Sequence, residues 1–176
     1  MAARVRAVLA RATRARWASK RVDRAAVTAY VALGANLGDA QATLRWALAA
    51  IGRLEGCQLS ASSSLYRTAP VDSSGPDYLN AVAAVQTTCT APGLLALLHG
   101  LEQQAGRERP YRNAPRTLDL DILLYGDAQV HSAQLTIPHP RMGQRAFVLV
   151  PLAEIAPDQV PAEQLQAVAA QACQRL

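Results

Sequence analysis

The sequence contains one phenylalanine and a single lysine among its 176 residues. The lysine, Lys20, lies in an arginine-rich stretch near the start, so residues 25–176 cannot hold the P-loop pattern G-x(4)-G-K-[ST]. The dinucleotide-binding pattern G-x-G-x-x-G is absent as well. A nucleotide site in this chain must therefore follow another scheme.

Cysteines and long apolar runs are also scarce. Cys57, Cys89 and Cys173 are far apart in sequence and show no C-x-x-C spacing, so we expect small buried thiols, which fit a reducing compartment. No stretch approaches the roughly 20 uncharged apolar residues that a membrane helix needs. We therefore expect a cytoplasmic protein with no membrane partner.

The net positive charge of the chain comes from its first 24 residues. Residues 1–24 carry eight basic residues against one acid, whereas the rest carries ten arginines and twelve acids. This basic N-terminal extension could be a disordered or loosely helical tail, an organelle transit peptide, or an arm that binds nucleic acid or a membrane surface. We assign residues 25–176 to a single domain, which is long enough to bury a sizeable core.

Apolar residues in this domain alternate between strand and helix periods. The pattern predicts strands at 27–33, 57–67, 78–88 and 117–126 and helices at 40–51 and 91–106. The second and third strands should pair antiparallel, residues 137–157 mix loop and short elements, and a last helix covers residues 162–173. This order predicts an α+β fold: a ferredoxin-like βαββαβ core with an antiparallel sheet, helices packed on it and extra C-terminal elements.

Two carboxylates lie within the predicted strand at 117–126. Side chains alternate faces along a strand, so Asp119 and Asp121 point the same way, roughly 6–7 Å apart. Leu118, Leu120 and Ile122 point the other way, into the core. Like charges on one face repel unless a cation lies between them, and Mg²⁺ bound with phosphates typically uses one or two carboxylates. The alternative is a solvated strand face that happens to carry two acids.

An arginine-rich loop leads directly into this strand. Arg107, Arg109, Arg112 and Arg116 fall within ten residues, and only Glu108 opposes them. Guanidinium groups bind phosphate oxygens bidentately and stay charged. The alternative for this loop is a solvated basic segment with no ligand. The loop and the aspartate pair together predict a site where Mg²⁺ bridges the acids to a polyphosphate and the arginines neutralise the remaining charge.

Four segments carry a family resemblance. They are "ALGANLGD", "YRTAPVDSSGPDYLNA", "GRERPYRNAPRTLDLDILLYG" and "IPHPRMGQRAFVLVPLAEIAP". They resemble the 6-hydroxymethyl-7,8-dihydropterin pyrophosphokinases of folate biosynthesis over about residues 27–160. The resemblance implies that ATP gives its terminal two phosphates, as one unit, to the hydroxymethyl oxygen of the pterin, and that AMP leaves.

The resemblance also implies roles for individual residues. Asp119 and Asp121 would hold two Mg²⁺ ions, and Arg107 and Arg116 would act with them in catalysis. The residues implied in ATP binding are Glu102, Arg107, Arg109, Arg112, Arg116, Thr136, His139 and Arg145. Those implied in pterin binding are Thr68, Tyr78, Asn80 and Phe147, with the ring held between the two aromatic side chains.

Some positions depart from the family pattern. Asn113 stands where many members have a tryptophan, in an arginine loop one residue shorter, and Ala35 replaces a frequent serine. The polar loops before Tyr78 and around the arginines have the composition of active-site lids that close over ATP. The resemblance further implies a monomer.

Two other readings remain at this point. One is an RNA-binding platform with a basic arm, which predicts aromatic residues on the central strands and a basic face. The domain has neither an RNP-like strand nor a basic net charge, so we expect no nucleic-acid partner. The other is a catalytically inactive relative, against which the presence of both aspartates and four loop arginines argues.

Overall fold

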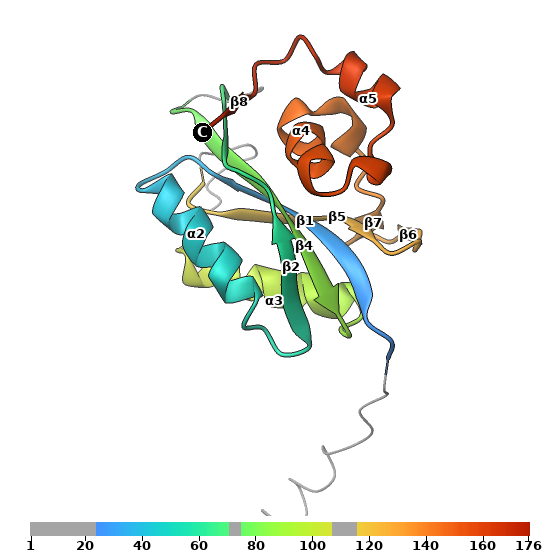
Figure 1. Ribbon diagram of the computed structural model, residues 1–176. Helices are drawn as coiled ribbons and strands as arrows, with labels where there is room; N and C mark the ends of the chain where they lie inside the picture. Colours follow the sequence, from blue (N-terminus) through green and yellow to red (C-terminus); the bar gives the residue numbers. More distant parts are fainter. Residues whose placement is uncertain (1–23, 71–74, 107–115) are drawn as a thin grey trace, which may run out of the picture.

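The fold is known from a computed structural model that describes residues 24–70, 75–106 and 116–176 (Figure 1). The strands are β1 (Val27–Ala35), β2 (Cys57–Ser62), β3 (Tyr66–Thr68), β4 (Tyr78–Thr87), β5 (Asp119–Tyr125), β6 (Val130–His131), β7 (Thr136–Ile137) and β8 (Gln174–Arg175). The α-helices are α2 (Ala40–Ile51), α3 (Ala91–Gln104), α4 (Ala146–Ile155) and α5 (Ala162–Ala167). None of these helices is long and apolar enough to cross a membrane.

The main sheet has the strand order that a ferredoxin-like core requires. Within the described ranges its six strands run β5-β1-β4-β3-β8, and β2 also pairs with β4. The pairings β1–β4, β1–β5, β2–β4 and β3–β4 are all antiparallel. The predicted α+β class and the antiparallel pairing of the second and third strands are confirmed.

The first two helices begin where the sequence predicts. The Asp39 side chain accepts a hydrogen bond from the backbone N–H of Ala42 at the start of α2, and Thr90 does the same for Gly93 in α3. Both helices bury a stripe at three- and four-residue spacing, such as Leu94, Leu98 and Leu101 in α3. The apolar periods were therefore sufficient to place both helices.

Each face of the sheet has its own core. Helices α2 and α3 pack on one face, and α4 covers part of the other (Figure 1). On β5, Leu120 and Ile122 belong to the first core, whereas Leu123 lies in the second with Leu149 of α4. Asp119 and Asp121 share the face of Leu123 because side chains alternate. The two acids therefore lie on the α4 side of the sheet.

The structure differs from the sequence-based prediction in three places. The strand at 57–67 is interrupted: Ser63 lies between β2 and β3 and exchanges hydrogen bonds with Val82 through its backbone N–H and its hydroxyl. The helix at 162–173 ends at Ala167, because Gln171 is used instead to bond the start of α4 through the N–H of Ala146. Helix α4 itself was not predicted, since Glu154 is its only charged residue, its apolar residues show no one-sided period and it contains Pro151.

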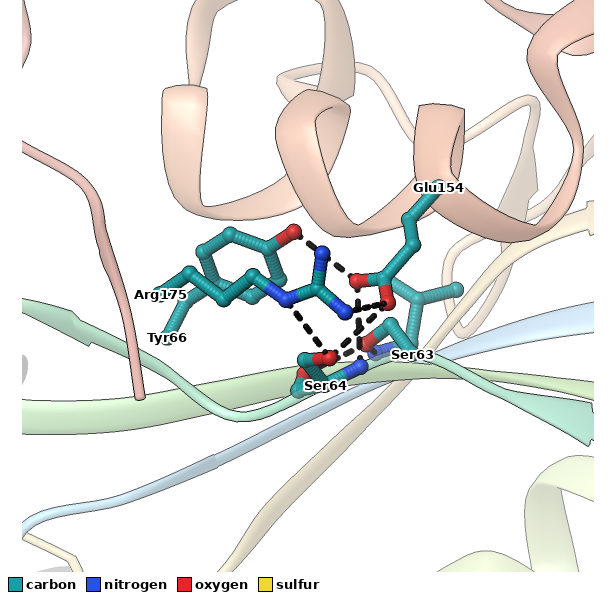
Figure 2. A network of polar contacts seen from close by, with 6 residues as sticks. Ser63, Ser64, Tyr66, Glu154 and Arg175 are labelled. Atoms are coloured by element: carbon teal, nitrogen blue, oxygen red, sulfur yellow. Dashed lines mark hydrogen bonds and ion pairs between the residues drawn. The ribbon is translucent and has the colours of Figure 1, made fainter.

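A polar network fastens α4 to β3 and β8 (Figure 2). The Glu154 carboxylate accepts hydrogen bonds from the Ser64 N–H at 3.0 Å, the Ser64 hydroxyl at 2.8 Å and the Tyr66 hydroxyl at 2.8 Å. Arg175 pairs with Glu154 at 3.1 Å and donates to the Ser64 hydroxyl. This network joins three segments that are distant in sequence, at the edge of the sheet where β3 pairs with β8.

Candidate active site

The site is built on three neighbouring strands whose register brings polar side chains together. Gly34 on β1 lies opposite Asn80 on β4 and opposite Asp119 on β5. Ala32 lies opposite Asp121. Because β1 places only Ala32 and Gly34 between them on this face, open space remains between the amide of β4 and the carboxylates of β5.

That space is a cavity of about 270 Å³. The described residues that line it are Ala32, Leu33, Gly34, Thr68, Ala69, Tyr78, Asn80, Arg116, Asp119, Asp121, Leu123, His139, Arg141, Gln144, Arg145, Phe147 and Val148. Nine of the residues predicted for the site are among them, from five different segments of the chain. The cavity has the size of a small-molecule pocket rather than of a macromolecular groove.

One end of the cavity is acidic with a basic rim. The Arg116 guanidinium is paired with Asp119. Burial, and then the charge of Asp119, raise the pKa of Asp121, while His139, Arg116 and Arg145 oppose that shift. Ionised together, the two acids repel each other, so this end favours a cation.

The same end can also accept an anion beside that cation. Burial, and then the neighbouring Arg141, lower the pKa of Arg145. Burial also lowers the pKa of His139, which favours the neutral imidazole near pH 7 although Asp121 opposes the shift. A phosphate between the guanidinium groups would relieve their repulsion.

The other end of the cavity is aromatic and amide-lined. Tyr78 and Phe147 line it, and the Arg145 guanidinium lies 5.3 Å from the centre of the Phe147 ring. Asn80 and Thr68 are both buried, and the Asn80 Nδ2 donates to the Thr68 Oγ1 at 2.9 Å. This bond orients the Asn80 amide and leaves its oxygen near Gly34.

Asn36 supports both ends and was not predicted. It is 4% exposed, and its side-chain Oδ1 accepts from the Arg116 N–H at 2.8 Å while its backbone N–H donates to the Arg116 carbonyl. Its Nδ2 donates to the Pro76 carbonyl at 3.2 Å, just before Tyr78. A polar residue directly after a buried strand was the available signal. Arg141 and Gln144 were missed too, although they lie within the quoted "PHPRMGQRAF" segment.

Some predicted residues lie elsewhere. Glu102 and Thr136 are not among the described residues that line the cavity. Glu102 is buried on α3, and its carboxylate accepts from the Leu120 backbone N–H at 2.8 Å. Thr136 lies in β7 opposite His131. Arg107, Arg109, Arg112 and Asn113 fall outside the residues that the structure describes.

Comparison with known proteins gives a consistent result. The family model for 7,8-dihydro-6-hydroxymethylpterin-pyrophosphokinase matches residues 30–157. The chain is 46% identical over 132 residues to a 2-amino-4-hydroxy-6-hydroxymethyldihydropteridine pyrophosphokinase of a Synechocystis strain, covering 75% of this chain and 68% of that one. It is 47% identical over 135 residues to the Haemophilus influenzae protein of the same description, covering 76% and 84%.

Solved structures show the same fold. Wild-type Plasmodium falciparum HPPK-DHPS superposes with a TM-score of 0.61 at 15% identity, over 85% of this chain. The A437G form gives a TM-score of 0.61 over 78% of this chain. The present chain spans 43% of the length of either of these larger proteins, so they support the fold alone.

Proposed function

Because the chain belongs to the 7,8-dihydro-6-hydroxymethylpterin-pyrophosphokinase family, we propose that it transfers the pyrophosphoryl group of ATP to the hydroxymethyl oxygen of 6-hydroxymethyl-7,8-dihydropterin, in folate biosynthesis. One observation carries this beyond the family name: a single cavity has paired carboxylates at one end and an aromatic, amide-lined pocket at the other. A polyphosphate and a flat heterocycle could thus be held side by side.

In this reaction the hydroxymethyl oxygen attacks the β-phosphorus of ATP. A new bond forms between that oxygen and the β-phosphorus, the bond from the β-phosphorus to the oxygen bridging it to the α-phosphorus breaks, and AMP leaves with that oxygen. The hydroxyl proton passes to solvent. The chain's main contribution is to hold two substrates in line, because positioning alone removes much of the barrier.

The pterin is assigned to the end of the cavity formed by Tyr78, Asn80, Phe147 and Thr68. The ring lies against the two aromatic side chains, a contact worth about 0.5–1.5 kcal/mol beyond the area buried. The Asn80 amide both donates and accepts, as the amide edge of a pterin requires. Its bond to Thr68 fixes the amide before the substrate arrives.

Asp119 and Asp121 are assigned as the residues that would hold Mg²⁺, with two ions expected. The described residues contain no group of three or more His, Cys, Asp or Glu side chains able to hold a metal. Two carboxylates nevertheless suffice when phosphates supply the remaining oxygens. The mutual repulsion of the acids supports a cation at this place. When bound, the ions polarise the phosphate oxygens that develop charge during transfer.

The basic residues are assigned to the triphosphate. Arg116 lies beside Asp119, while His139 and Arg145 approach from the segment before and at the start of α4. Guanidinium groups at this place stabilise the charge of the transferring phosphoryl unit. It remains a prediction that ATP is also bound by Arg107, Arg109, Arg112 and Thr136. The monomeric state remains a prediction as well.

The proposed reaction is tested by the nucleotide product. The full chain is incubated with Mg²⁺, ATP and the reduced hydroxymethylpterin, and the products are separated by anion-exchange chromatography. We expect AMP and the pterin pyrophosphate in equal amounts, no AMP without the pterin, and none after chelation of Mg²⁺. ADP as the sole nucleotide product would show a simple kinase and contradict the proposal.

A further inference from the structure

A buried carboxylate on α3 contacts the backbone between the two acids of the site. The Glu102 Oε1 accepts a hydrogen bond from the Leu120 N–H at 2.8 Å. Leu120 separates Asp119 from Asp121 in sequence, and Glu102 and Leu120 are 2% and 1% exposed. The contact is therefore shielded from water and lies directly behind the acidic pair.

The position of β5 in the sheet explains why such a contact is needed. Among the described strands of the main sheet β5 has a single neighbour, β1, so it is an edge strand. An edge strand leaves alternate N–H groups without a strand partner, and a buried N–H without a partner is costly. Glu102 supplies that partner from the neighbouring helix.

The contact acts on the backbone and not on the cavity. Asp119 and Asp121 face the cavity on the α4 side of the sheet, whereas α3 packs on the opposite face. Glu102 is not among the described residues that line the cavity, so its contact with Leu120 is made behind the site. The contact fixes the backbone between the two residues that carry these carboxylates.

We infer that Glu102 is a positioning residue for the metal-holding acids: it holds the Leu120 peptide, and so sets the spacing and direction of Asp119 and Asp121. This inference rests on the proposed function and differs from the direct nucleotide contact that the family resemblance implies. Partners that orient metal ligands typically change metal affinity by about 10–100-fold when removed.

Two variants separate the reach of the side chain from its charge. Glu102→Gln keeps the length and a carbonyl acceptor for Leu120 but loses the charge. Glu102→Asp keeps the charge but is one methylene too short to reach the Leu120 N–H. Each full-length variant is titrated with Mn²⁺ in the presence of α,β-methylene-ATP, and metal binding is followed by water-proton relaxation.

We expect Glu102→Asp to weaken Mn²⁺ binding by about tenfold or more, and Glu102→Gln to stay near the wild-type affinity. Amide exchange at Leu120 should be faster in Glu102→Asp and protected in Glu102→Gln. Pterin affinity, measured by fluorescence, should be unchanged in both variants because Tyr78 and Asn80 lie on another strand. That last measurement also shows that each variant is folded.

The reverse result would overturn the inference. If Glu102→Gln loses Mn²⁺ and Glu102→Asp keeps it, the charge matters and the contact with Leu120 does not. Equal, wild-type affinity in both variants would likewise exclude a positioning role. The metal titration does not depend on turnover, so a wild-type chain that makes no AMP would defeat the proposed function without deciding the role of Glu102.

Discussion

At the level of single side chains, the acidic pair combines a proposed role in holding Mg²⁺ with a cost to stability. Burial and Asp119 raise the pKa of Asp121. A group whose pKa is raised in the fold contributes stability below its unfolded pKa and loses it as the pH rises through the folded pKa. Above the unfolded pKa of an aspartate, and without metal, burying the Asp121 carboxyl beside Asp119 therefore destabilises the fold.

Replacing this carboxylate should separate activity from stability. We expect Asp121→Asn to lower the rate of AMP formation by about 10²–10³-fold, the loss typical when a charge-stabilising group is removed. Its melting temperature in the absence of Mg²⁺ should equal or exceed that of the wild type, because the repulsion from Asp119 is gone. Calorimetry measures the melting temperature, and product analysis on the same preparation measures the rate of AMP formation. A variant with a lower melting temperature than the wild type would contradict the repulsion between the two acids.

Gly34 is expected to control the pterin end of the cavity. A Cβ at this position would lie 3.3 Å from the Asn80 Oδ1, so the amide that Thr68 holds would have to move. We expect Gly34→Ala to raise the half-saturating pterin concentration by roughly 10-fold or more, the usual effect of one added carbon in a fitted pocket. The half-saturating ATP concentration should change much less.

Gly100→Ala is the matched control for this substitution. Gly100 lies inside α3, and an added Cβ would meet no atom within 4 Å. Alanine is favoured over glycine in a helix by about 0.5–1 kcal/mol, so this variant should be slightly more stable with unchanged pterin kinetics. Equal kinetic effects of the two substitutions would mean that Gly34 has no special role.

At the level of helices and strands, the Glu154 network decides how α4 lies against the sheet. The same helix carries Phe147 at its start, and β3 ends with Thr68, so both sides of the pterin end depend on this junction. We expect Glu154→Gln to lower the free energy of unfolding by about 1–3 kcal/mol, as for other hydrogen bonds to a charged group. Urea denaturation measures this difference.

The difference in the free energy of unfolding between the wild type and Glu154→Gln should depend on pH. Burial opposes ionisation of Glu154, but the hydrogen bonds from Tyr66 and Ser64 outweigh it and lower its pKa. A lowered pKa contributes stability above the unfolded pKa, about 4.3 for glutamate, and that stability disappears as the pH falls through the folded value. The gap between wild type and Glu154→Gln should therefore narrow below about pH 4. A gap that stays constant into acid would contradict the assignment.

Tyr66 should make the stability contributed by the same network decrease at alkaline pH as well. Burial, and then the hydrogen bond to Glu154, raise the pKa of Tyr66 to about 12. The stability linked to this group is present below the ordinary tyrosine pKa of about 10 and is lost as the pH rises from there toward 12. In Tyr66→Phe the stability between pH 10 and 12 should fall less steeply than in the wild type.

At the level of the whole molecule, the basic N-terminal extension and the residues of the hydrophobic cores occupy separate parts of the chain. The basic residues at positions 1–24 lie before β1, and both described cores are formed by residues from 27 onward. We therefore expect a chain that begins at Ala25 to keep the wild-type melting temperature and rate of AMP formation. A large loss of either would show that the N-terminal extension takes part in folding or in the site.

Much of the fold and the chemistry was contained in local patterns of the sequence. The apolar periods of α2 and α3 and the two-residue alternation around Asp119 depend on neighbours in sequence, so they can be recognised without coordinates. The sequence also identified nine residues of the cavity, because their types and order match a family pattern.

What required the tertiary structure was every feature that depends on contacts between distant segments. Helix α4 has no amphipathic period because it is buried on several sides, so it cannot be recognised from the sequence pattern. It is identified only by its packing against β4 in the structure. The roles of Asn36, Glu154 and Glu102 depend on partners that are 18 to 90 residues away, such as Leu120 for Glu102. Gly34 lies between Asn80 and Asp119 because β1 pairs with both β4 and β5, and these strands are distant from it in sequence.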